Sequence, residues 1–197
     1  NNFEKQSKGD FTMPVRIASS LSIAAIALSG MAYAEPPAGA DHPLSFMFGE
    51  WVGEASGVSQ TGPYAITQTE RVGPILEGDA VVIEGRGYSE AGETMFNAFA
   101  VVSKTASDGG WEMRSYAQGR AGTFPFELTE TGYVWSVPAG PNARMIYTAH
   151  FDGDVWQQTG QYTPEQGEPR QTFQMTLTRT SNTDWPAGDP VSPNSGE

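Results

Sequence analysis

Five side chains in this sequence would bind a ligand or transfer a proton if the fold placed them on a common surface. They are Arg86, Arg114, Tyr116, Tyr147 and His150. Guanidinium and phenol groups bind the carboxylate or polar head of an amphipathic molecule. Near neutral pH the imidazole of His150 could act as a general base or a metal ligand. Whether these groups act together depends on the strands that carry them.

Two arrangements of these side chains are open. Each arginine shares its strand face with a glutamate two residues earlier, as Glu84–Arg86 and Glu112–Arg114. If these faces point inward, the charges must be paired, and Tyr116 and Tyr147 would join them around a polar head. If they point outward, the pairs are surface ion pairs that contribute little stability. Alternation puts Tyr147 on the face opposite His150, so the five residues cannot all line one cavity, and we expect the arginines to face outward.

Other motifs for catalysis or metal binding do not occur in the sequence. With no cysteine, the chain cannot form disulfides, thiolate zinc sites or a cysteine nucleophile. Neither a Gly-x-Ser-x-Gly elbow nor a Ser-x-x-Lys pair is found. Asp152-Gly153-Asp154 lacks the twelve-residue calcium loop and is typical of a hairpin turn. We therefore assign no catalytic residue and no metal.

Residues 13–34, MPVRIASSLSIAAIALSGMAYA, have the pattern of a secretory signal peptide. Arg16 precedes an apolar run of about a dozen residues, and Ala32-Tyr33-Ala34 has the small residues of a cleavage site. The run is shorter than the roughly 20 residues that span a bilayer. We expect residues 1–34 to be an upstream segment and leader, and the protein to be periplasmic or secreted in a bacterium, with no integral membrane segment after cleavage. An uncleaved anchor is the alternative.

The charge of the chain limits its partners. Eleven Lys and Arg residues stand against 23 Asp and Glu residues, a formal net charge of −12. Such a chain is repelled by nucleic acid and by anionic membrane surfaces. The charge favours solubility, and steering of cationic ligands is the alternative reading.

Turn residues recur every eight to twelve residues after position 50, with short alternating segments between them. This spacing predicts ten antiparallel strands, in a meander, a sandwich or a barrel. The expected strands are 50–58, 64–73, 80–88, 94–104, 111–118, 121–129, 132–137, 143–151, 155–163 and 171–180. A short helical turn is expected at 43–48. Residues 181–197 are polar and rich in proline, which predicts a disordered tail in which Trp185 is the one residue suited to docking.

A helical turn leads into Gly-x-Trp in residues 44–54, LSFMFGEWVGE, and a polar strand follows at 64–73. This pattern resembles uncharacterised bacterial lipocalin-like domains related to nitrobindin, within the calycin barrels. The resemblance covers residues 41–180 and implies a single all-β, antiparallel, roughly ten-stranded lipocalin-like barrel with a short N-terminal helical turn. It also implies a structural plug at one end, in which Trp51 meets an arginine of the last strand, here Arg179.

The resemblance to nitrobindin also implies haem, held through a histidine near the C-terminal end of the barrel. The matching segment, 171–180, contains no histidine. The two histidines of the chain are His42, expected to be exposed before the first strand, and His150. We therefore assign no cofactor.

We predict an exported protein that binds a small hydrophobic or amphipathic molecule, with no catalysis assigned. One alternative is a barrel enzyme of the isomerase or hydratase type, with His150 or a cavity tyrosine as its acid–base group. The other is a filled barrel that serves as a ligand-free interaction or stress module. The sequence does not indicate an oligomeric state.

Overall fold

The computed structural model describes residues 41–59 and 61–185. The predicted leader and the segment before it lie outside these residues, as does most of the predicted tail. The described chain consists almost entirely of β-strands. No helix in it is long and apolar enough to cross a membrane.

The strands follow the predicted segments closely. They are β1 (Gly49–Ser59), β2 (Gly62–Ile75), β3 (Ala80–Tyr88), β4 (Thr94–Lys104), β5 (Trp111–Ala117), β6 (Arg120–Thr129), β7 (Gly132–Pro138), β8 (Ala143–Asp152), β9 (Val155–Pro164) and β10 (Arg170–Ser181). Two 3-10 turns accompany them, η1 (Ser45–Met47) and η2 (Leu76–Gly78). All ten predicted strands are confirmed, and η1 lies within the helical turn predicted at 43–48.

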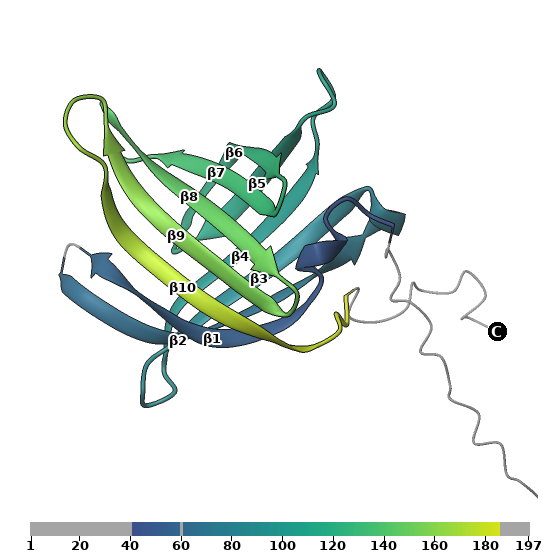
Figure 1. Cartoon of the computed structure of the whole chain (residues 1–197), viewed down its shortest axis with the longest axis horizontal. Coiled ribbons are helices and arrows are strands. Elements are labelled where there is room, and N and C mark those ends of the chain that lie inside the picture. The colour runs from purple at the N-terminus through teal and green to yellow at the C-terminus, as the bar shows by residue number, and fades with distance from the viewer. Residues whose placement is uncertain (1–40, 60, 186–197) are drawn as a thin grey trace, which may run out of the picture. The chain divides into compact units, whose positions relative to one another are not determined.

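The strands form one closed antiparallel barrel in which each strand pairs with the next along the chain. The barrel closes where β1 pairs with β10, for example at Trp51 opposite Arg179, and Figure 1 shows these two strands side by side. Closure gives every strand two partners, so the sheet has no free edge. The predicted barrel is confirmed, and the open meander and the sandwich are excluded.

One end of the barrel, which we call the floor, is filled with apolar side chains. Trp51 donates its indole Nε1–H to the carbonyl of Met47 in η1 at 2.9 Å, which fixes the turn beneath the barrel. The Arg179 guanidinium lies 4.1 Å from the centre of a Trp51 ring. It also donates to the carbonyl of Phe46 and to Asp154, both at 3.0 Å. The predicted Trp51–Arg179 contact is therefore present at this end of the barrel.

The Asp152–Asp154 segment forms the tight turn between β8 and β9. Asp152 pairs with Val155, and Gly153 has a φ of 56°, which glycine adopts without strain. The predicted hairpin turn is thus confirmed. Its Asp154 carboxylate accepts a hydrogen bond from Arg179, so this turn is part of the floor.

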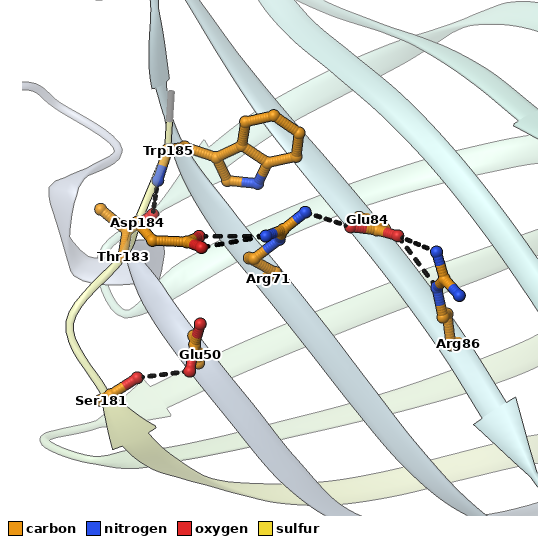
Figure 2. Close-up of polar contacts among 8 residues, drawn as sticks. All are labelled: Glu50, Arg71, Glu84, Arg86, Ser181, Thr183, Asp184 and Trp185. Atoms are coloured by element: carbon orange, nitrogen blue, oxygen red, sulfur yellow. Dashed lines mark hydrogen bonds and ion pairs between the residues drawn. The ribbon is translucent and has the colours of Figure 1, made fainter. Parts of the chain in front are cut away.

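The chain beyond β10 continues along the outside of the barrel as far as Trp185. Figure 2 shows Arg71 of β2 between Asp184 and Glu84, with Trp185 beside its guanidinium. The guanidinium lies 4.5 Å from the Trp185 ring. A side chain at Gly73 would come within 2.6 Å of the Trp185 Cβ, so the glycine makes room for this segment. Residues 181–185 therefore pack on the barrel, whereas the sequence predicts a disordered tail from 181.

Arg71→Ala should release Trp185 from the outer face, because it removes the cation–π contact and the ion pair with Asp184 together. In NMR spectra the Trp185 indole resonance should move to the position of a solvent-exposed tryptophan, while the barrel resonances stay in place. Arg114→Ala is the matched control, since Arg114 is paired only with Glu112 on its own strand. An unchanged Trp185 resonance in Arg71→Ala would show that the contact does not hold the segment.

Candidate functional site

Four of the five predicted ligand residues lie on the outer face of the barrel. Arg86 donates its Nε–H to Glu84 at 2.9 Å, and Arg114 contacts Glu112 at 3.1 Å. Both arginine side chains are more than half exposed. The outward arrangement expected from the sequence is the observed one. These residues cannot line the barrel interior, because alternation turns their side chains away from it.

The other two outward residues have different surroundings. Tyr116 is 55% exposed, and with Arg86 it lines a shallow depression of about 490 Å³ on the outside of β3, β4 and β5. His150 is exposed, and its Nδ1 lies 2.8 Å from the Thr131 hydroxyl. The structure therefore brings Arg86 and Tyr116 together on the surface. Arg114 and His150 do not line this depression.

Tyr147 is the one predicted ligand residue that faces the interior. Its ring stacks on Trp135, with centroids 4.5 Å apart, and meets the edge of Phe173 at 6.0 Å. Burial raises the pKa of the Tyr147 phenol, so the group is neutral at physiological pH. All three rings remain partly accessible, whereas Trp51, Trp156 and Phe126 at the floor are fully buried. They form an aromatic group in the half of the barrel away from η1, which we call the mouth.

Two polar side chains of β2, Gln68 and Glu70, also project into the interior. Glu70 lies opposite Trp51 of β1 and Gly85 of β3. The Gln68 amide donates to Glu70 Oε1 at 2.8 Å. A Cβ atom at Gly85 would lie 2.8 Å from both carboxylate oxygens. Glycine at position 85 therefore gives the carboxylate its place against the barrel wall.

A second polar pair lies in the same part of the interior. The buried Tyr133 hydroxyl donates to Gln158 Oε1 at 2.9 Å. The pKa of Tyr133 is raised well above its ordinary value by burial and, to a smaller extent, by the nearby charge of Glu70. Tyr133 is therefore a neutral hydrogen-bonding group that stands near the carboxyl group of Glu70.

Glu70 has no cationic partner among the residues that the structure describes. Burial raises its pKa to about 7, partly offset by the hydrogen bond from Gln68, and the charge of Glu84 adds to the rise. Arg71 and Arg86 face outward and are paired there, and Arg179 is bound at the floor. A carboxyl group with a pKa of about 7 is close to half protonated at neutral pH. Small changes in its surroundings therefore alter its charge.

The interior differs between the floor and the mouth. At the floor the largest side chains are fully buried, among them Trp51, Trp156, Phe126, Met47 and Leu177. Across the neighbouring strands, the residues that pair in turn with Glu70 are all small. They are Gly85 on β3, Ala98 on β4 and Ala117 on β5. These residues add little bulk to the wall beside the carboxyl group. At the floor, the Nε1–H of Trp156 is buried without an acceptor among the described residues.

The sequence did not predict four residues of this region, Glu70, Gln68, Tyr133 and Gln158. The first pair could have been found from the alternation Ile66, Gln68, Glu70, Val72, which puts both polar residues on the same face as two apolar ones. That pattern was present in the segment described only as a polar strand. The pairing of Tyr133 with Gln158 joins residues 25 positions apart, which no local pattern indicates.

The side chains of this barrel do not fit the haem site implied by nitrobindin. The inward residues of β10 include Phe173, Met175 and Leu177, none of which carries a nitrogen ligand. The His42 Nδ1 accepts a hydrogen bond from the Leu44 amide at 3.0 Å, and its ring packs on Phe48. His42 is thus partly buried rather than exposed as expected, and burial lowers its pKa. His150 lies outside the barrel.

Comparison with known proteins identifies the fold and no more. No family model and no curated protein matches the sequence. Among solved structures, the crystal structure of Rv2717c from M. tuberculosis matches with a TM-score of 0.53 at 13% identity, over 74% of this chain and 98% of that chain. At this identity the match shows a shared calycin-type barrel, so the predicted resemblance is confirmed at the level of the fold.

Glu70→Gln should remove a pH dependence of stability. The folded-state pKa of about 7 lies above the ordinary value of 4.5, so the folded protein binds the proton more tightly than the unfolded chain. Stability from this group is complete below about pH 4.5 and is lost as the pH rises through 7, by on the order of 3 kcal/mol. Denaturant unfolding between pH 5 and 8 should show this decline in the wild type and not in Glu70→Gln.

The matched control for this experiment is Glu112→Gln, which neutralises a carboxylate on the outer face. It should keep the decline of the wild-type protein. Equal slopes for wild type and Glu70→Gln would mean that the interior carboxyl group titrates like one in water.

Proposed function

We propose that the protein binds a small amphipathic molecule in the mouth of its barrel, without covalent chemistry. The observation that carries this proposal is the contrast between a filled floor and a partly accessible mouth. Binding sites for small molecules are concave and mainly apolar, with a few polar groups that fix the orientation of the ligand. The mouth of this barrel has that character.

The aromatic group at the mouth supports the apolar part of such a ligand. Trp135, Tyr147 and Phe173 offer ring faces and edges that are not completely covered by protein. Burying a partly exposed ring against a ligand is favourable at about 25 cal/mol per Å² of apolar surface. The opposite wall, formed by β3, β4 and β5, has only small side chains in the row of Gly85, Ala98 and Ala117.

The polar groups between mouth and floor support the placement of the ligand head. Glu70 and Gln68 lie on one side, and Tyr133 and Gln158 lie on β7 and β9. All four are inside the barrel, where a hydrogen bond to a ligand competes with little water. The depression with Arg86 and Tyr116 on the outer face is a weaker candidate because it is shallow and its charges are already paired.

The catalytic alternative assigned acid–base chemistry to His150 or to a cavity tyrosine. The His150 imidazole lies on the outer face, so an inward tyrosine such as Tyr147 is the group left for that role. The ligand-free alternative is supported by the filled floor. The ligand-free alternative predicts that the mouth binds no amphipathic molecule, whereas the present proposal predicts that it does.

Ala98→Leu should block binding, since the longer side chain would project into the interior beside Gly85. Fluorescence titration with Nile red, a neutral amphipathic dye, should show binding to the wild type and an affinity lower by about tenfold or more in the variant. Ala106→Leu makes the same change in the exposed turn between β4 and β5 and should bind the dye like the wild type. No binding by any of the three proteins would favour the ligand-free module.

Export to the periplasm or the medium is also part of the proposal, and it rests on residues 13–34. In a bacterial host, the exported protein should begin at Glu35, as measured by intact-protein mass spectrometry. Ala34→Trp should prevent cleavage because the site requires small side chains at its first and third positions. Tyr33→Ala, at the intervening position, should leave cleavage unchanged. A wild-type protein that retains residues 13–34 after export would indicate an anchor.

A further inference from the structure

The interior carboxyl group of Glu70 places a condition on the ligand that goes beyond shape and polarity. An ion enclosed in a protein is strongly unfavourable unless a charge of opposite sign accompanies it. Surface carboxylates of this barrel have such partners, as Glu84 and Glu112 do in their arginines. Glu70 has only the neutral amide of Gln68 within hydrogen-bonding distance among the described residues.

The nearby arginines are not available to Glu70. Arg71 follows it in the chain, yet its side chain lies on the outer face between Glu84 and Asp184 (Figure 2). Arg179 lies over Trp51 and is bound to Asp154 and to the carbonyl of Phe46. The protein therefore places one carboxyl group on an inward position of the barrel and supplies no described cation for it.

The groups around Glu70 suit a cation that enters from the mouth. Trp51 is its direct neighbour on β1, and Tyr133 stands near it across the interior. Aromatic rings attract ammonium groups through their negative faces, and the partly accessible rings are those of the aromatic group at the mouth. Both carboxylate oxygens lie against Gly85, in the space that a side chain at position 85 would take. Only Oε1 accepts a hydrogen bond from a described residue, so Oε2 can receive a ligand donor.

We infer that the molecule bound in this barrel is an amphipathic amine whose protonated nitrogen pairs with Glu70. The inference rests on the proposed function, because it assigns the charge of the ligand head at the same site. The ammonium would donate to Glu70 while its apolar part lies against the aromatic group at the mouth. The net charge of −12 adds a long-range attraction for such ligands.

The titratable groups that face Glu70 set the pH for a test. Glu84 lies on the neighbouring strand with its side chain outward, and the pKa of its carboxyl group is lowered by Arg86 and Arg71. Tyr133 stays neutral because its pKa is raised. At about pH 8 the Glu70 carboxyl group is mostly ionised and a primary amine is still protonated.

Dansylcadaverine, which carries a primary amine, and its N-acetyl derivative form a matched pair of probes that differ mainly in charge. At about pH 8 and about 0.15 M salt, the wild type should bind the amine on the order of tenfold more tightly than the acetylated probe. Glu70→Gln should bind the two probes equally. Its glutamine can still accept the hydrogen bond from Gln68, and circular dichroism would verify its fold.

Two further proteins make the result specific. Glu112→Gln removes one negative charge from the outer face and should keep the preference of the wild type, which separates the interior carboxylate from general attraction. Glu70→Asp keeps the charge and should keep a preference for the amine. If Glu70→Gln does not fold, Glu70→Ala, which also removes the charge and is smaller, should bind the two probes equally.

The possible failures are distinguishable. If the wild type binds both probes equally and Ala98→Leu weakens both, the barrel binds amphipathic molecules and the inference about charge is wrong. If Glu70→Gln retains the preference for the amine, the attraction comes from elsewhere on the protein and the inference is again wrong. If the wild type binds neither probe, nor Nile red, the proposed function fails together with the inference.

Discussion

The pairing of β1 with β10 is the interaction on which the rest of this structure depends. It converts a chain of hairpins into a closed barrel, and closure obliges every second side chain of each strand to share one interior. Outer-face charges such as Arg86 and Arg114 can pair with neighbours and remain in water. An ionisable side chain on an inward position is instead turned away from bulk solvent, toward the interior of the barrel.

The floor gives this closure its rigidity at one end. Trp51 is held by the carbonyl of Met47 below it and by the Arg179 guanidinium beside it, and Arg179 is held in turn by the β8–β9 turn. Three segments distant in sequence are thus joined at one indole. The largest side chains are gathered at this packed end. The row that starts at Glu70 has only small side chains on the neighbouring strands, at Gly85, Ala98 and Ala117.

Much of the fold was predictable from the sequence, and most of the site was not. Turn residues and alternation gave all ten strands, because hairpins are local and their period is two. Alternation also assigned Tyr147 and His150 to opposite faces correctly. Alternation alone does not identify the inward face. The candidate ligand residues were chosen for their chemistry, and the arginines and the histidine among them lie on the outer face. The enclosure of Glu70 depends on Gly85 and on Tyr133, which only the closed barrel brings near it.

Stability alone does not account for a glutamate at position 70. A glutamine there would retain an acceptor for the Gln68 amide, and it would remove the unfavourable burial of a charge. The wall is nevertheless shaped around a carboxylate, since glycine at position 85 clears the space that both oxygens occupy. The fold therefore accommodates a group that weakens it near neutral pH. The carboxyl group of Glu70 is explained most directly by a ligand that enters the barrel and supplies the positive charge that no described residue provides.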